Sequence, residues 1–401
     1  MVYQSIMAMI DPVELARALI RRPSVTPRDE GALDVLQAAL AGIGFVCTRM
    51  VFAESGGDPV DNLYARWGRE GPVFAYAGHT DVVPTGLLSD WTHPPFEAVV
   101  EDGILWGRGA ADMKGGIAAF VAAAERVIAA GPETGIGGSI AMIITGDEEG
   151  PAINGTRRVL DWMAQSGKAI DHCIVGEPSS NERLGDMIKV GRRGSTNCTL
   201  NVAGRQGHVA YPQRAHNPIP PLLKMLLALS EPPLDDGFEN FQPSNLQITD
   251  VHVGNPAANV IPSRASARFN IRFNPSWTAA SLEAHLRARL DAVAALTGAQ
   301  YELTAVCSGD AFLTTDASFL ALIDAAVRDK TGLTPERSTT GGTSDARFIK
   351  SLAPVAELGL VGQSIHKIDE HAAVADIEAL ADIYALIMTR YFDRFGVAVQ
   401  A

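Results

Sequence analysis

The stretch GHTDVVP, residues 78–84, follows a short apolar run at residues 73–77 and decides how the rest of the chain is interpreted. A short apolar run bounded by turn residues is typical of a buried strand. Residues i and i+2 of an extended segment lie on one side, so Asp81 is placed to orient the ring of His79 toward a metal. A lone His-x-Asp pattern also occurs at turns, and the metal-site hypothesis therefore depends on further ligands.

The length and composition of the chain bound its class. It has 401 residues, of which 47% are hydrophobic and 20% charged, which is ordinary globular composition and enough for two domains. The formal net charge is −13. This charge disfavours nucleic acid and anionic membranes as partners, and we expect neither.

The cysteines and the N-terminal stretch indicate a cellular compartment. Cys47, Cys173, Cys198 and Cys307 are scattered without a CxxC pair, which argues against a disulfide framework and a thiolate zinc site. The N-terminal stretch has no basic region of the kind that begins a signal peptide, and no apolar run is long enough to cross a bilayer. We therefore expect a cytoplasmic protein.

Apolar runs alternate with polar motifs and helical segments in both outer parts of the chain. Residues 73–77, 139–145 and 173–175 are the expected buried strands, and each is followed by acidic residues or histidine. This order predicts an α/β fold whose mostly parallel sheet is flanked by helices. Sites in such sheets lie beyond the carboxyl ends of the strands. The expected helices span residues 13–20, 27–41, 117–130, 156–165, 317–330 and 377–392.

The pattern of predicted secondary structure changes in the middle of the chain. Half-exposed, alternating strands and two helices follow in the order β-α-β-β-α-β, which predicts an inserted α+β ferredoxin-like domain. We assign residues 194–306 to this domain, and residues 1–193 and 307–401 to the catalytic domain. An antiparallel sheet with open edges is a natural place for a second subunit to pair.

The strand ends and loops carry a set of residues that could hold two metal ions. Neutral imidazole and carboxylate both suit zinc. Glu148 is a spare carboxylate beside a candidate ligand, and it could take a proton from a water molecule. This chemistry supports amide hydrolysis. The candidate metal ligands are His79, Asp112, Glu149, Glu177 and His366.

Six motifs together resemble the di-zinc aminoacylase and carboxypeptidase family. They occur in the family's order and span nearly the whole chain: GHTDVVP, GRGAADMKGG, GDEEG, VGEPS, GGTSDAR and SIHKIDE. The resemblance implies a zinc-peptidase-like catalytic domain and an inserted dimerisation domain. It also implies two Zn²⁺ per subunit, with Co²⁺ able to replace zinc in one site, and a homodimer formed through the inserted domain.

The same resemblance implies roles for individual residues. Asp112 would bridge the two ions, and the peptide bond from Asp112 to Met113 would be cis. Glu148 would be the general base, Asp81 would orient His79, and His208 would reach the partner subunit's active site and help stabilise the oxyanion. The remaining ligands would be His79 and Glu177 on one ion, and Glu149 and His366 on the other.

Details at residues 91–96, 191–195, 207–212 and 364–367 favour one substrate within this family. They resemble members that hydrolyse the amide of N-succinyl-LL-2,6-diaminopimelate, a small molecule that carries carboxylates at both ends. Arginine matches carboxylates bidentately, so Arg192 and Arg272 are candidates for binding its two ends. N-acetylornithine deacetylases, acylamino-acid carboxypeptidases and a catalytically inactive binding protein on the same scaffold are the alternatives. Further substrate contacts are expected at Ser195, Tyr211, Asn259, Gly342 and Thr343.

Overall fold

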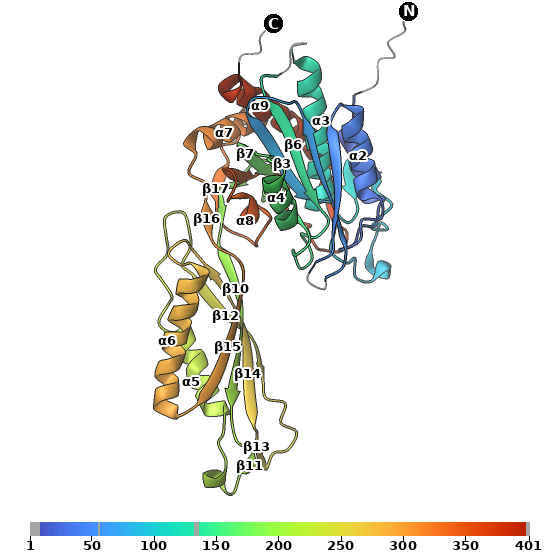
Figure 1. The fold of residues 1–401 in the computed structure, drawn as a ribbon. Helices are drawn as coiled ribbons and strands as arrows, with labels where there is room; N and C mark the ends of the chain where they lie inside the picture. Colours follow the sequence, from blue (N-terminus) through green and yellow to red (C-terminus); the bar gives the residue numbers. More distant parts are fainter. Residues whose placement is uncertain (1–8, 55–56, 132–135, 398–401) are drawn as a thin grey trace, which may run out of the picture. The chain divides into compact units, whose positions relative to one another are not determined.

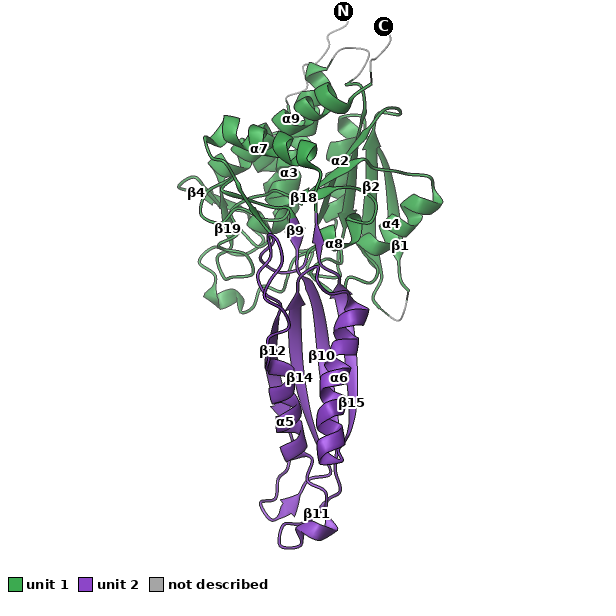
Figure 2. Cartoon of the chain, turned by 90° about the vertical axis from the view of Figure 1, so that its left-hand side faces the viewer, with its two compact units in different colours: residues 1–190, 314–338, 344–401 green, residues 191–313, 339–343 purple. Residues whose placement is uncertain are grey.

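The computed structural model describes residues 9–54, 57–131 and 136–397, and its chain divides into two compact units. Unit 1 comprises residues 1–190, 314–338 and 344–401, and unit 2 comprises residues 191–313 and 339–343 (Figure 2). Both units mix helices and strands (Figure 1). The fold is α/β, as the sequence predicts.

An eight-stranded mixed sheet forms the centre of unit 1. The pairs β3–β6, β3–β7, β7–β18 and β8–β17 are parallel, and β1–β2, β2–β6 and β8–β18 are antiparallel. In spatial order its strands are β1 Val46–Phe52, β2 Val60–Trp67, β6 Ser139–Thr145, β3 Val73–His79, β7 His172–Val175, β18 Val355–Glu357, β8 Met187–Lys189 and β17 Glu336–Ser338.

Helices flank this sheet (Figure 1). Unit 1 also contains a small three-stranded sheet. The small sheet consists of β4 Val99–Glu101, β5 Ile104–Trp106 and β19 His371–Ala373. The helices of unit 1 are α1 Pro12–Ile20, α2 Ala32–Gly42, α3 Gly115–Ala130, α4 Thr156–Gln165, α7 Ala317–Thr331, α8 Ala346–Ile349 and α9 Val374–Phe395, with a single turn at Leu88–Asp90.

The three central strands bring the candidate ligands to one sheet edge. Every residue of β3, β6 and β7 is buried, as expected of strands covered on both faces. The register pairs His79 with Thr145 and Ala77 with Val175, so the three strands end side by side. The motifs that follow them therefore start at the same edge of the sheet.

Helix α2 begins later than the sequence analysis predicts. We expected residues 27–41, but the helix starts at Ala32. Gly31 before it has φ = +83°, which ends the preceding turn in a left-handed conformation that glycine tolerates. The Asp29 carboxylate accepts hydrogen bonds from the backbone amides of Gly31 and Leu33 and thereby stabilises this later start.

Unit 2 is a four-stranded antiparallel sheet with two helices. Its strands lie in the order β12 Asn245–His252, β14 Arg264–Phe273, β10 Gly194–Ala203 and β15 Gln300–Gly309. Helices α5 Ile219–Ser230 and α6 Ala279–Thr297 pack with this sheet on a shared apolar core. The chain order β10-α5-β12-β14-α6-β15 is the ferredoxin-like arrangement expected from the sequence.

Short elements complete unit 2. They are β9 Gly191–Arg192 with β16 Phe312–Leu313, β11 Gly207–His208 with β13 Val260–Ile261, and a turn of 3₁₀ helix at Pro212–Arg214. Across the part of the chain that the structure describes, every helix is too short or too polar to cross a bilayer.

Candidate metal centre

Two groups of candidate ligands share one residue, Asp112. Its Oδ1 lies 3.3 Å from His79 Nε2, and that nitrogen lies 3.8 Å from Glu177 Oε1. Its Oδ2 lies 3.2 Å from His366 Nε2, which lies 2.9 Å from Glu149 Oε1. Within each group the ligand atoms all lie within 4.8 Å of one another. Each oxygen of Asp112 thus faces a different pair of candidate ligands.

The ring of His79 is oriented by a backbone carbonyl. Its Nδ1 lies 2.9 Å from the Asp81 carbonyl oxygen, which can only accept, so Nδ1 carries the proton. Nε2 then presents its lone pair toward Asp112. The Asp81 carboxylate, which we expected to hold the ring, lies farther away, at 3.7 Å. It accepts hydrogen bonds from the backbone amides of Glu148 (3.3 Å) and Glu149 (3.1 Å).

Asp112 lies on an irregular turn, Ala110–Lys114, that leads into α3. Its backbone is non-helical (φ −120°, ψ 94°), and the bond to Met113 is cis, which confirms the expectation from sequence. The side chain is 7% exposed. Its two carboxylate oxygens nevertheless lie 3.2–3.3 Å from the two histidines.

Glu177 follows β7 at a point of close packing. A Cβ on the preceding Gly176 would lie 1.8 Å from the Tyr76 hydroxyl oxygen and 2.7 Å from Met113 Cε. Glycine is therefore required before Glu177, because any other residue would push this strand end out of place. The strand end in turn sets the distance from Glu177 to His79.

Burial and mutual attraction shift the pKa values of both histidines. Burial alone would lower the pKa of His79, but the Asp112 and Asp81 carboxylates outweigh it and raise that pKa well above its usual value. Hydrogen bonds to Asp112 and Glu149 raise the pKa of His366 to about 10. Both shifts show that this part of unit 1 attracts positive charge.

The pKa values of the carboxylates at this site shift in opposite directions. Burial, followed by the neighbouring carboxylates, raises the pKa values of Glu148 and Glu177 well above normal. Burial opposes ionisation of Asp112, but its interactions with His366 and His79 lower its pKa. Packed carboxylates of this kind are stabilised by protons or by cations.

The donor set fits a pair of divalent ions. Among the described residues, His79 Nε2 and Asp112 Oδ1 are buried without a hydrogen-bond partner, which is costly unless another group satisfies them. Imidazole nitrogen and carboxylate oxygen are the ligands that zinc accepts. The ligand atoms of His79, Glu148 and Glu149 also lie within 4.8 Å of one another. Glu148 therefore lies beside the candidate ions.

The substrate-binding candidates all belong to unit 2. Ser195 on β10 pairs directly with Arg272 on β14. Burial lowers the pKa of Arg272, and the positive charge of Arg193 lowers it further, so two arginines lie close enough to repel. Arg193 is a residue that the sequence analysis did not select. Arg192 Nη1 donates to the carbonyls of Thr340 (3.1 Å) and Gly342 (3.2 Å).

The remaining candidates in unit 2 lie on exposed loops and short strands. His208 is exposed, and its Nδ1 accepts a hydrogen bond from the Ala210 amide at 3.0 Å. Its ring lies 5.9 Å from the ring of Tyr211, which is 50% exposed. The carbonyl of Asn259 accepts from the Val209 amide. Thr343 is half-buried.

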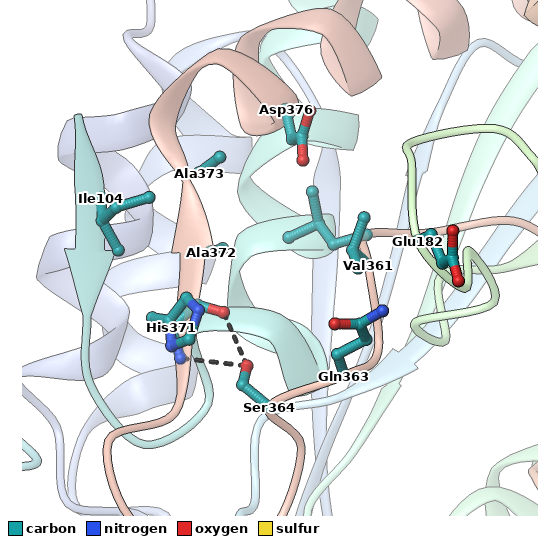
Figure 3. A pocket seen from close by; sticks show the side chains of 10 residues that line it. Ile104, Glu182, Val361, Gln363, Ser364, His371, Ala372, Ala373 and Asp376 are labelled. Carbon is teal, nitrogen blue, oxygen red and sulfur yellow. Dashed lines mark hydrogen bonds between the residues drawn. The ribbon is translucent and has the colours of Figure 1, made fainter.

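A small cavity is lined by Ser364 and His371, which flank His366 in the chain (Figure 3). Its volume is about 160 Å³, which is below the roughly 300–1,000 Å³ of typical ligand pockets. None of the candidate ligands lines it. Hydrogen bonds between Ser364 and His371 shape the loop that carries His366. We therefore do not regard this cavity as the substrate site.

Sequence reasoning missed two charged residues of unit 1 that contact the ligand-bearing segments. Glu370 and Arg108 are both buried and form an ion pair with an N–O distance of 2.7 Å. They belong to the motifs SIHKIDE and GRGAADMKGG, close to predicted ligands. The signal available in the sequence was that each of the two charged residues lies close to a predicted ligand. Their pairing could not be predicted, because they lie 262 positions apart in the chain.

Curated relatives match almost the entire chain. Succinyl-diaminopimelate desuccinylase of Rhodospirillum centenum is 57% identical over 383 residues, covering 95% of this chain and 97% of the relative. The protein of the same name from Rhodospirillum rubrum is 56% identical over 391 residues, covering 96% and 99%.

Solved structures share the fold at low sequence identity. A tripeptidase from Staphylococcus aureus superposes with a TM-score of 0.77 at 19% identity, covering 96% of this chain and all of that chain. A protein from Bacillus subtilis, described as a dinuclear metal binding peptidase, gives 0.69 at 17% identity, covering 95% and 98%. The model of peptidase family M20/M25/M40 matches residues 75–390. This chain therefore belongs to peptidase family M20/M25/M40.

Proposed function

We propose that this chain hydrolyses the amide of N-succinyl-LL-2,6-diaminopimelate and releases succinate and LL-2,6-diaminopimelate, as a step of lysine and diaminopimelate biosynthesis. The observation that carries this proposal is the pair of three-residue groups that share Asp112, with Glu148 beside them. The identity of 54–57% to desuccinylases over nearly the full chain supports the same substrate. The reaction belongs in the cytoplasm, where we place the protein.

The metal site holds two zinc ions in this proposal, and cobalt could replace zinc in one of them. His79 and Glu177 would hold one ion, Glu149 and His366 the other, and Asp112 would be shared. The unsatisfied buried atoms of His79 and Asp112 support this assignment. Bound ions supply Lewis-acid activation of the scissile carbonyl and of the attacking water.

Glu148 is the proposed general base. It lies one residue from a candidate ligand, and burial raises its pKa well above the ordinary glutamate value. A carboxylate with a raised pKa takes a proton from water more readily than an ordinary one. Glu148 would accept that proton and then donate it to the nitrogen of the leaving amine.

His208 is proposed to donate a hydrogen bond to the developing oxyanion in the partner subunit's active site. Its Nδ1 accepts from the Ala210 amide, so in the neutral ring Nε2 carries the proton. A fixed N–H donor is what an oxyanion needs. The homodimer would form through unit 2, where the edge strand β12 exposes Ile248 (40%) and Val251 (50%).

The carboxylates of the substrate are proposed to bind arginines of unit 2. Arg272 and the neighbouring Arg193 repel each other, and an anion placed against them would relieve that repulsion. Arg192 holds the carbonyls of Thr340 and Gly342, so it would also shape the loop that carries Gly342 and Thr343. Ser195, Tyr211 and Asn259 would supply the remaining polar contacts.

A substrate panel tests this proposal. Zinc-loaded protein is assayed with N-succinyl-LL-2,6-diaminopimelate, N-acetylornithine and an acyl-glutamate. We expect rapid turnover of the succinyl compound and slow turnover of the others. Fast hydrolysis of N-acetylornithine with none of the succinyl compound would overturn the assignment. Absence of turnover with all three would instead favour a binding protein on the same scaffold.

A further inference from the structure

Arg108 and Glu370 form a buried ion pair whose contribution to folding stability does not explain its place in the fold. The two side chains are 2% and 1% exposed, and Arg108 Nη1 lies 2.7 Å from Glu370 Oε2. A buried ion pair contributes little net stability, because removing two charges from water offsets their attraction. The other hydrogen bonds of this pair show what else it does.

Glu370 holds the backbone of the shared candidate ligand. Its second oxygen, Oε1, accepts hydrogen bonds from the backbone amides of Ala111 and Asp112, each at 3.1 Å. Asp112 has a non-helical backbone, so the turn does not fix its position as a regular helix would. Glu370 supplies that fixed point from outside the turn.

The same two residues hold the loop that carries His366. Arg108 Nη1 also donates to the carbonyl of Lys367, the residue after His366, at 3.1 Å. The Gly107 amide donates to the carbonyl of Glu370 at 2.9 Å. The segment before Asp112 and the loop after His366 are therefore joined by side-chain and backbone hydrogen bonds.

The loop requires such restraint because its backbone is unfavourable. His366 has φ = +62° and Asp369 has φ = +56°, a left-handed conformation that residues other than glycine adopt only when their surroundings impose it. The His366 side chain is 49% exposed, so packing restrains it weakly. The Ser364 hydroxyl bonds the amide and carbonyl of His371 and closes the loop (Figure 3).

We propose that Glu370 is a positioning residue for the metal centre. Together with Arg108 it locks the backbone of Asp112 to the loop of His366, so that both ligands meet one ion at a fixed separation. This inference rests on the proposed function, since it assumes that Asp112 and His366 bind metal. Glu370 itself touches neither ion nor substrate.

Two substitutions separate this role from ordinary stabilisation. In Glu370→Gln the side chain keeps its shape but has one oxygen and one NH₂ group. Whichever way the amide turns, the NH₂ group faces donors, either Arg108 or the amides of Ala111 and Asp112. One half of the connection must therefore break. Glu370→Ala removes both halves.

Asp316→Asn is the matched control. The Asp316 carboxylate also accepts from two backbone amides, those of Ser318 (3.0 Å) and Phe319 (2.9 Å), and it also pairs with a basic side chain, His172. Among the described residues, its hydrogen-bond partners include no candidate metal ligand. Loss of stability without loss of metal binding is the expected result for this variant.

Zinc titration calorimetry on the metal-free full-length variants is the test. We expect both Glu370 variants to bind the zinc ion held by Asp112 and His366 about 10–100-fold less tightly than the wild type does. Residues that orient metal ligands typically have effects of this size on metal affinity. We also expect kcat to fall while KM changes little, with Asp316→Asn unchanged in both. If Glu370→Ala does not fold, Glu370→Gln carries the comparison.

Two results would overturn the inference in distinguishable ways. Wild-type affinity for both zinc ions in the Glu370 variants, with reduced thermal stability alone, would show that the ion pair is merely structural. A wild-type chain that binds no zinc would remove the inference together with the proposed function.

Discussion

The Asp81 carboxylate accepts a hydrogen bond from the backbone amide of Glu149 at 3.1 Å. Asp81 thus connects the strand end that carries His79 with the segment that carries Glu148 and Glu149, while its carbonyl orients the His79 ring. One residue between two strand ends therefore influences a candidate ligand on each side.

Removing the Asp81 carboxylate should weaken catalysis without changing the substrate contacts. Asp81→Ala leaves the amides of Glu148 and Glu149 without their acceptor. We expect kcat to fall about 10–100-fold, the range typical of residues that orient metal ligands. Asp81→Asn keeps one oxygen and should lose less. Steady-state kinetics at saturating zinc measures both, and an unchanged kcat in Asp81→Ala would contradict the expectation.

Glu148→Ala should separate metal binding from turnover. Glu148 belongs to neither of the two groups that share Asp112, so we expect both zinc ions to remain bound. Loss of a general base should lower kcat about 10²–10⁴-fold. Metal analysis and kinetics on the same preparation check this. Loss of an ion together with activity would instead assign Glu148 as a ligand.

His366→Ala should lose one of two zinc ions. The group of Asp112, Glu149 and His366 would then keep two ligands, while the group with His79 and Glu177 stays complete. His93→Ala is the control, because His93 belongs to none of the groups and contacts Glu101. Measuring the zinc content per chain of both variants tests this expectation. Two ions still bound after His366→Ala would count against this ligand assignment.

Mixed dimers should reveal whether His208 acts in the partner subunit. We expect homodimers of His208→Ala and of Glu148→Ala each to be nearly inactive, but a mixed dimer would contain one site with both residues intact. An equal mixture should recover about a quarter of wild-type activity, because half of the dimers are mixed and each has one working site. If the two inactive chains recover no activity after unfolding and refolding together, His208 does not act across the dimer.

Asp316 should make folding stability depend on acid pH. The hydrogen bond from the Phe319 amide, aided by His172, lowers the pKa of Asp316 from 3.8 to about 2. A lowered folded-state pKa gives stability that is present above about pH 4 and is lost as the pH falls toward 2. Asp316→Asn keeps a capping oxygen but loses the negative charge at the start of α7, so it should be less stable by roughly 0.3–1 kcal/mol near neutral pH. Urea unfolding should show this difference shrink near pH 3, and a constant difference would contradict it.

Most of unit 1 could be predicted because its central strands are continuous apolar runs bounded by turn residues. The expected strand at residues 139–145 matches β6, and the helix at residues 156–165 matches α4. Ligand sites lie at strand ends in such sheets, so the sequence alone was enough to group the motifs that follow β3, β6 and β7.

The contacts that depend on distant pairs could not be predicted. The spacing of His79 and Asp81 suggested a carboxylate contact with the ring, but the carboxylate bonds amides 67 and 68 positions away. Glu370 likewise reaches Asp112 across 258 positions. Local periodicity carries no information about such pairs, because they arise only when separate strands and loops pack together.

Zinc stoichiometry measured beside turnover decides whether this chain is a two-zinc hydrolase. Metal-free protein is titrated with zinc, and bound ions per chain and hydrolysis of N-succinyl-LL-2,6-diaminopimelate are followed in the same samples. We expect two ions per chain at saturation, with activity rising as they bind. Fewer than one bound ion per chain, with no activation by added zinc, would contradict it.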